Sequence, residues 1–136
     1  MDDKKCVLIL DEELPLGLIA NASAVLALTL GKIVDGILGH DIQDKSGENH
    51  LGITNTVLPI LKSNKENLTL LCEKAKSMEG IVVVDFSDVA QRTKNYEDYA
   101  EQLAETNAED LRYLGIALFG DKKAVNSLAG SLPLLR

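Results

Sequence analysis

Three aspartates lie at the ends of apolar runs in the sequence. Asp11 follows residues 6–10, while Asp85 and Asp88 lie near the end of residues 81–86 and just beyond it. Such runs are typical of strands buried on both faces, and the carboxyl ends of parallel strands meet at one edge of a sheet. Two carboxylates held close together raise the pKa of one of them, which suits general acid–base catalysis. These three residues are therefore predicted catalytic residues, with the capping of the following turns as the structural alternative.

Polar residues near the same predicted edge are candidates for ligand binding. Asn21 lies inside a long apolar stretch, where an unpaired carboxamide would cost about 1–3 kcal/mol. We predict that Asn21 binds a ligand; the alternative is that it ties its helix to a neighbouring backbone carbonyl. Ser87 follows the strand that holds Asp85, and Thr54 and Thr56 precede another apolar run. They are predicted to complete the ligand site.

No motif for a nucleophile or a cofactor accompanies these residues. The sequence has neither Gly-x-Ser-x-Gly nor a glycine-rich phosphate loop. His40 and His50 lie among several acids, but their spacing matches no metal motif. A calcium loop that starts at Asp41 would need glycine where Ser46 stands. We therefore expect no cofactor and no metal, and a solvent-exposed turn in this segment.

The overall charge argues against one class of partner. The 136-residue chain carries a formal net charge of −7, and only 4% of its residues are aromatic. Proteins that bind nucleic acids neutralise phosphates with clustered Lys and Arg and often stack bases on aromatic rings. A nucleic-acid partner is therefore not expected.

Cysteine usage and hydropathy predict a cytoplasmic protein. Cys6 and Cys72 lie in apolar segments without a partner at metal or redox spacing, which is typical of buried free thiols in a reducing compartment. Acidic residues 11–13 interrupt the N-terminal apolar stretch, which argues against a signal peptide. Residues 14–31 are uncharged and nearly long enough to cross a membrane, but Pro15 and the lack of a second such segment favour a core helix. No membrane partner is expected.

Strand and helix patterns alternate from the N-terminus onward. Residues 5–10 are predicted to form a strand, and residues 14–34 a helix that is apolar nearly all round and must be buried on most sides. Residues 40–50 are predicted to form a hairpin or ordered loop about a turn. Residues 56–62 form the next strand, in which Pro59 favours an edge position.

The second half continues the alternation. Asn64 is predicted to cap a helix that ends near Gly80, and a strand follows at residues 81–86. After a short helix, the acidic segment 94–110 presents one apolar face at helical spacing, made of Tyr96, Tyr99, Ala100 and Leu103. An amphipathic helix packed over the domain is the ordinary interpretation, and a mobile lid is the alternative.

The last predicted elements are a strand at residues 113–119 and a helix that follows Gly120 and stops at Gly130. Apolar strands that alternate with helices imply an α/β fold with a mainly parallel sheet covered on both sides. Four strands are enough for a three-layer α/β/α sandwich. We expect a single domain over residues 1–136.

Three segments of the chain carry a family resemblance. They are residues 5–11 with Leu14-Pro15-Leu16-Gly17 and Asn21, residues 52–54 with 59–61, and residues 111–120 with 123–132. Together they resemble a family of small bacterial proteins of unknown function that is grouped by fold with the type II peptidyl-tRNA hydrolases. The resemblance implies a three-layer α/β/α fold with a four-stranded mixed sheet.

The resemblance also implies candidate site residues. Type II hydrolases typically carry a lysine-rich turn between the first strand and the first helix. This chain has acidic residues at 12–13, and only Gly17 matches the glycine of that turn, so Gly17 joins the predicted ligand-binding residues. The hydrolases also carry an aspartate and a threonine after the third strand, to which Asp88 and Thr93 correspond, with Asp85 as a competing match.

Three functions follow as hypotheses. The first is a binding or regulatory module that holds a small polar ligand, or a protein partner, at the strand-end rim around Asn21. The second is a hydrolase that acts on peptidyl- or aminoacyl-tRNA or a related ester, with Asp11, Asp85 or Asp88 directing water. The third, compatible with the first, is a homodimer or other oligomer whose partner covers the helix at 14–34 or the face at 96–103.

Overall fold

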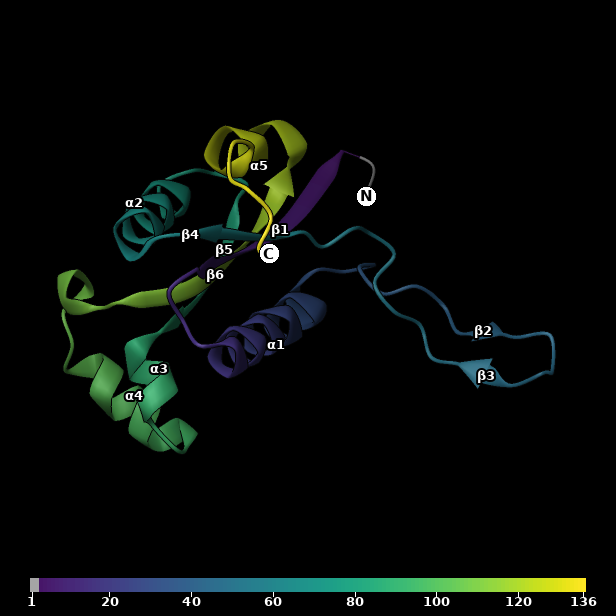
Figure 1. Ribbon diagram of the computed structural model, residues 1–136, viewed down its shortest axis with the longest axis horizontal. Coiled ribbons are helices and arrows are strands. Elements are labelled where there is room, and N and C mark those ends of the chain that lie inside the picture. Colours follow the sequence, from purple (N-terminus) through teal and green to yellow (C-terminus); the bar gives the residue numbers. More distant parts are fainter. Residues whose placement is uncertain (1–2) are drawn as a thin grey trace.

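A computed structural model describes residues 3–136, and a four-stranded sheet lies at its centre (Figure 1). The strand order is β4-β1-β6-β5. The two central strands are β1 (Lys4–Asp11) and β6 (Tyr113–Asp121), which are buried along most of their length. The edge strands are β4 (Ile60–Ser63) and β5 (Val82–Ser87). The edge position predicted from Pro59 is thus confirmed for β4, although the strand begins at Ile60 rather than at residue 56.

Strand direction corrects one expectation. β1 pairs with β4 in parallel, but β6 is antiparallel to both of its neighbours, β1 and β5. The four-stranded mixed sheet is confirmed, whereas the mainly parallel pairing is wrong. The helices α3 (Asp88–Arg92) and α4 (Tyr96–Ala104) lie between β5 and β6. Ser87 at the end of β5 pairs with Tyr113 at the start of β6, so residues 88–112 stay at one end of the sheet and the chain turns back antiparallel.

Helices cover both faces of the sheet (Figure 1). α1 (Leu16–Ile33) packs on one face over Cys6, Leu8 and Leu10, while α2 (Lys65–Lys76) and α5 (Lys122–Ala129) pack on the other. Because β1 alternates its side chains between the two faces, its apolar run supplies both cores. Cys6 and Cys72 are buried free thiols, as predicted, and burial raises the pKa of Cys6 to about 11.

α1 is less buried than its composition suggests. Only Ala22, Leu26 and Leu30 are fully buried, while Leu16 and Leu28 are among the most exposed apolar residues of the chain. By length and composition α1 could also cross a membrane, a test that core helices pass as well. The expectation of a helix buried on most sides is therefore wrong, because a single sheet face covers only one stripe of a helix.

Residues 38–57 form a projection that we call the arm. It contains the two-stranded hairpin β2 (Ile42–Gln43) and β3 (Asn49–His50), and it extends away from the sheet (Figure 1). The predicted turn is confirmed, because Gly47 N–H donates to the Asp44 carbonyl at 3.0 Å.

α4 and the C-terminal tail complete the fold. α4 carries the predicted apolar face, but none of its residues is fully buried, and a short 3-10 helix, η1 (Ala108–Asp110), follows it. The tail at residues 133–135 runs antiparallel to β4, where Lys62 N–H donates to the Pro133 carbonyl and Leu135 N–H to the Ile60 carbonyl. The tail therefore closes the β4 edge.

Candidate functional site

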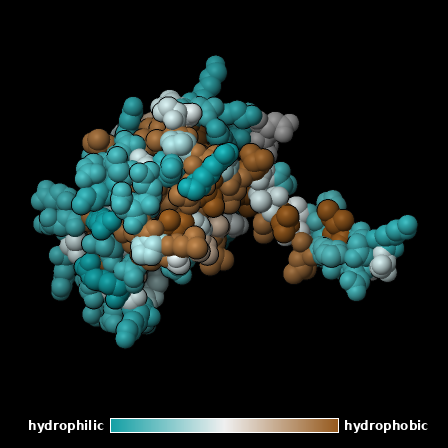
Figure 2. Space-filling model, in the orientation of Figure 1, coloured by the Kyte–Doolittle hydropathy of each residue, from teal (hydrophilic) through white to brown (hydrophobic). Residues whose placement is uncertain are grey.

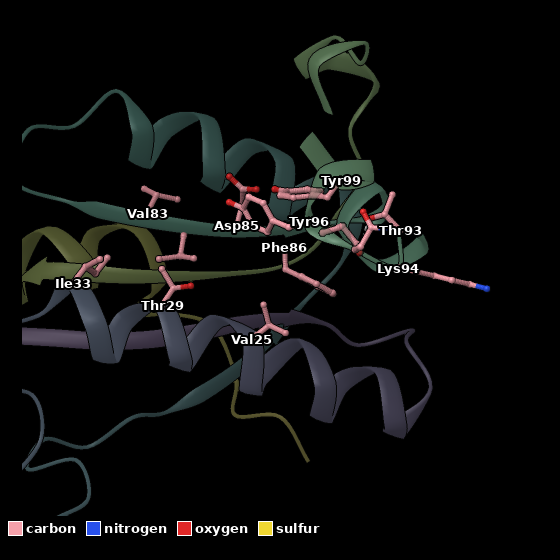
Figure 3. A pocket seen from close by; sticks show the side chains of 13 residues that line it. Val25, Thr29, Ile33, Val83, Asp85, Phe86, Thr93, Lys94, Tyr96 and Tyr99 are labelled. Atoms are coloured by element: carbon pink, nitrogen blue, oxygen red, sulfur yellow. Dashed lines mark hydrogen bonds between the residues drawn. The ribbon is translucent and has the colours of Figure 1, made fainter. Parts of the chain in front are cut away.

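A cavity of about 590 Å³ lies beside the edge strand β5. α1 supplies Val25, Thr29 and Ile33 on one side, and the segment from Thr93 to Tyr99 closes the other side (Figure 3). The volume is within the range of small-molecule sites, about 300–1,000 Å³. The wall combines apolar side chains with hydroxyl groups and one carboxylate, Asp85.

Asp85 is held by an ion pair on one of its two oxygens. Its Oδ2 atom lies 3.2 Å from the Lys76 ammonium group, and its side chain is about one-quarter exposed at 28%. Burial opposes the charge of Lys76, but Asp85 and other neighbours outweigh this effect, so the pKa of Lys76 is raised. The ammonium group also lies 5.5 Å from the centre of the Tyr113 ring. Lys76 thus orients Asp85 and remains positively charged at neutral pH.

Two tyrosines of α4 form the outer wall. The Tyr96 and Tyr99 rings meet edge to face at a centroid distance of 5.6 Å. Figure 3 shows the Tyr99 ring beside Asp85, whereas the Lys94 side chain extends away from the cavity. Burial, and then the negative charge of Asp85, raises the pKa of Tyr99. Its hydroxyl therefore stays protonated at neutral pH and can both donate and accept a hydrogen bond.

Asp11, the first predicted catalytic residue, is fully engaged within the protein. It is 1% exposed; its Oδ1 accepts from Glu13 N–H at 2.9 Å, and its Oδ2 lies 2.9 Å from the Arg112 guanidinium. Arg112 is half-exposed. Asp11 therefore anchors a turn and an arginine, and it does not line the cavity beside β5.

Asp88 and Ser87 have capping contacts. Asp88 Oδ1 accepts from the backbone N–H groups of Val89 and Arg112, and its Oδ2 lies 3.3 Å from the Arg92 guanidinium. Ser87 Oγ accepts from Ala90 N–H at 3.5 Å as the N-cap of α3. Asp11 and Asp88 thus cap the turns that follow them, which was the structural alternative to a catalytic role. Of the three aspartates, Asp85 alone lines the cavity.

The remaining predicted ligand-binding residues lie elsewhere. Asn21 and Gly17 are exposed on α1, so the argument that a buried carboxamide needs a partner does not apply to Asn21. Thr54 and Thr56 belong to the arm, where Thr54 Oγ1 donates to the Thr56 carbonyl and accepts from Thr56 N–H. The structure does not gather these residues around Asp85. Among residues 3–136, no three His, Cys, Asp or Glu side chains are arranged to hold a metal ion.

Sequence reasoning missed Lys76 and Arg112. Lys76 lies in the last turn of α2, where a lysine also suits the helix dipole and gives no separate signal. Arg112 directly precedes β6. If β6 ran parallel to β1, Arg112 would lie at the opposite end of the strands from Asp11. The antiparallel direction of β6 was thus the missing information for Arg112.

Comparison with known proteins identifies a family. Residues 4–136 match the family described as protein of unknown function (DUF2000). A protein of unknown function from Agrobacterium tumefaciens strain C58 has a similar structure, with a TM-score of 0.90, 18% sequence identity and 98% of each chain covered. At that identity the similarity establishes the fold alone. No curated protein matches the chain. The match over nearly the whole length shows that this chain belongs to the DUF2000 family, whose function is unknown.

Proposed function

We propose that this protein binds a small polar molecule in the cavity beside β5, with Asp85 as the charged contact. The observation that carries the proposal is the position of Asp85. Of the three predicted aspartates, it alone lines this cavity, and no hydrogen bond to its Oδ1 is present among the described residues. The ligand site proposed here therefore lies at the β5 edge, and not at the rim around Asn21 that the sequence predicted.

The wall of the cavity defines the chemistry of the ligand. A carboxylate only accepts hydrogen bonds, so the ligand must offer a donor such as an ammonium, amide or hydroxyl group. The Tyr96 and Tyr99 rings favour a cation over the other two donors. Val83, on the same face of β5 as Asp85, provides a contact for an aliphatic part. The cavity is lined on its α1 side by three further apolar side chains, Val25, Ile33 and Phe86. We therefore propose a small amine with a short apolar chain.

The hydrolase hypothesis has less support. Neither Asp11 nor Asp88 lines the cavity. Asp11 is 1% exposed and paired with Arg112, and Asp88 accepts from Val89 N–H and pairs with Arg92. A shared fold with the type II peptidyl-tRNA hydrolases also remains a proposal, supported by the helices on both faces of a four-stranded mixed sheet.

Thermal unfolding tests the proposed site. A panel of aliphatic and aromatic primary amines is screened against the wild-type protein for an increase in Tm, since a ligand that binds only the folded state stabilises it. At 100 times its Kd, such a compound adds about 2.7 kcal/mol. The same compound is then tested on Asp85→Asn and on the control Glu101→Gln, which removes an exposed carboxylate of α4 that does not line the cavity.

We expect stabilisation of the wild-type and Glu101→Gln proteins and none of Asp85→Asn. The Asp85→Asn protein remains folded, because the lost ion pair is half-exposed at Lys76 and contributes less than about 1 kcal/mol. Equal stabilisation of all three proteins would place the ligand elsewhere. A panel without any stabilising amine would contradict the proposed ligand class.

A further inference from the structure

The arm exposes several large apolar side chains. Leu51 and Ile53 are 77% and 78% exposed, and Leu38, Ile42 and Val57 are exposed as well. An isolated two-stranded hairpin is marginally stable in water, and soluble proteins rarely expose neighbouring apolar groups without a partner. The arm therefore has the composition of a surface that another molecule covers.

Specific contacts give the arm one shape. Gly39 N–H donates to the Ile53 carbonyl at 2.8 Å, and Asp41 Oδ1 accepts from Gly52 N–H at 2.9 Å. A Cβ atom at Gly52 would overlap the Gly39 carbonyl oxygen, so the two sides of the arm approach here as closely as glycine allows. An arm held in this way presents its apolar side chains in a fixed arrangement rather than as a loose loop.

A second uncovered apolar surface lies on α1. Leu16 is 83% exposed and Leu28 is 76% exposed, and no charged residue occurs between them. Ala20 and Ala24, which are also exposed, lie between them at steps of four residues, so the surface is continuous along α1. Figure 2 shows apolar residues on the body of the molecule and again along the arm.

We propose that two copies of this chain form a dimer in which the arm of each copy lies on the outer face of α1 of the other. A two-fold axis makes such a contact reciprocal, so that one dimer covers both apolar surfaces of each chain. The arm extends away from the sheet and from α1 of its own chain (Figure 1). The α1 surface that covers the arm is therefore proposed to come from a second copy. This proposal does not depend on the ligand site beside β5.

The available area agrees with a dimer. Seven exposed side chains belong to the two surfaces: Leu16, Leu28, Leu38, Ile42, Leu51, Ile53 and Val57. At roughly 60–120 Å² of apolar surface for each complete side chain, and allowing for partial burial, they supply about 300–550 Å² per copy. Homodimer interfaces are about 65% apolar, so the total is about 450–850 Å² per copy. A standard interface buries about 800 Å² per partner.

The charges disfavour a membrane as the occupant. The net charge is −7, and the arm carries Asp41, Asp44 and Glu48 near its tip. An anionic lipid surface repels a protein with this net charge and repels the acidic tip of the arm. Helices that bind at a membrane surface instead carry Lys or Arg beside their apolar face.

Sedimentation velocity of the full chain tests the dimer. The experiment uses 50 µM protein, roughly 100-fold above a dimer Kd of about 0.5 µM. The mass derived from the sedimentation of the wild-type protein should then be twice the chain mass of 14.7 kDa. Arm variant Leu51→Glu/Ile53→Glu and helix variant Leu28→Glu should each weaken the dimer by about 100-fold or more, because each buries a carboxylate in an apolar contact. The control Leu70→Glu changes a leucine of α2 that is 63% exposed and lies outside both surfaces, and it should leave the dimer intact.

Mixing the two variants tests the reciprocal contact. An arm-variant chain retains a normal α1 and a helix-variant chain retains a normal arm, so the mixture regains one of the two contacts and should associate more strongly than either variant alone. Circular dichroism checks that each variant is folded. A monomeric wild-type protein, or a dimer that survives the arm substitutions, would overturn the proposal. A monomer that instead pellets with phosphatidylserine vesicles would assign the two surfaces to a membrane.

Discussion

Asp11 and Arg112 are separated by 101 positions in the sequence and are joined by one short ion pair. Asp11 is buried, and its second oxygen accepts from Glu13 N–H, so the carboxylate depends on partners within the protein. A buried charge without a partner is strongly destabilising, whereas exposed pairs contribute little. The position of Asp11 at the end of a strand thus serves stability more directly than catalysis.

Replacing Arg112 by Met should therefore destabilise the protein by about 2–3 kcal/mol, because it leaves the Asp11 carboxylate buried with one partner fewer. Arg92→Met is the matched control, since the Arg92 pair with Asp88 is exposed and should contribute less than about 1 kcal/mol. Urea unfolding of both variants measures the two values. Similar losses of unfolding free energy for the two variants would show that the buried Asp11–Arg112 pair contributes no more to stability than the exposed Asp88–Arg92 pair.

At the scale of the elements, close contact between α1 and the sheet depends on a glycine of β6. A Cβ atom at Gly115 would lie 2.7 Å from Leu10 Cδ1 and 3.2 Å from Leu26 Cδ1. Both leucines are fully buried in the core between α1 and the sheet, so they have little room to move. The distance between α1 and the sheet is therefore set in part at this position.

Gly115→Ala should destabilise the protein by about 1–3 kcal/mol through overpacking, although alanine is otherwise tolerated in strands. Gly17→Ala, in the first turn of α1, has open space around it and should stabilise the protein by up to about 1 kcal/mol through helix propensity. Thermal unfolding of the two variants should thus shift Tm in opposite directions. A neutral Gly115→Ala would mean that α1 moves outward at little cost.

At the scale of the whole molecule, the acidic net charge determines which ligands the surface attracts. The net charge of −7 gives a repulsive field toward polyanions, and four of the 14 Lys and Arg side chains (Lys4, Lys76, Arg92 and Arg112) pair with carboxylates within residues 3–136 of the same chain. The same negative field suits the capture of a small cation in the cavity beside β5.

The protein should accordingly bind bulk tRNA weakly at every salt concentration. A filter-binding assay between 50 mM and 200 mM KCl should show flat, near-background retention, whereas a protein with roughly 6–10 phosphate contacts loses about 10³–10⁵-fold in affinity over that range. Tight binding at low salt that falls steeply with added salt would contradict this prediction and revive the hydrolase hypothesis.

Much of the fold followed from the sequence alone, because local chemistry decides it. Apolar runs predicted the strands β1, β5 and β6, of which β1 and β6 are buried and the edge strand β5 is partly exposed. Asn64 predicted the start of α2, where its side chain accepts from Asn67 N–H. The turn at Asp44 and the edge position of β4 also followed from local rules for turn residues and proline. These features depend on neighbours in the sequence, so they needed no tertiary information.

The direction of β6, the exposure of α1 and the site were decided only by the tertiary structure. Residues 88–112 stay at one end of the sheet and reverse the last strand, which brings Arg112 to Asp11 and leaves Asp85 at an open edge. Whether an apolar helix is covered depends on how many elements reach it, and here one sheet face does. Residue types could therefore propose carboxylates as site residues, but only their three-dimensional neighbours separate Asp85, which faces a cavity, from Asp11 and Asp88, which hold the fold.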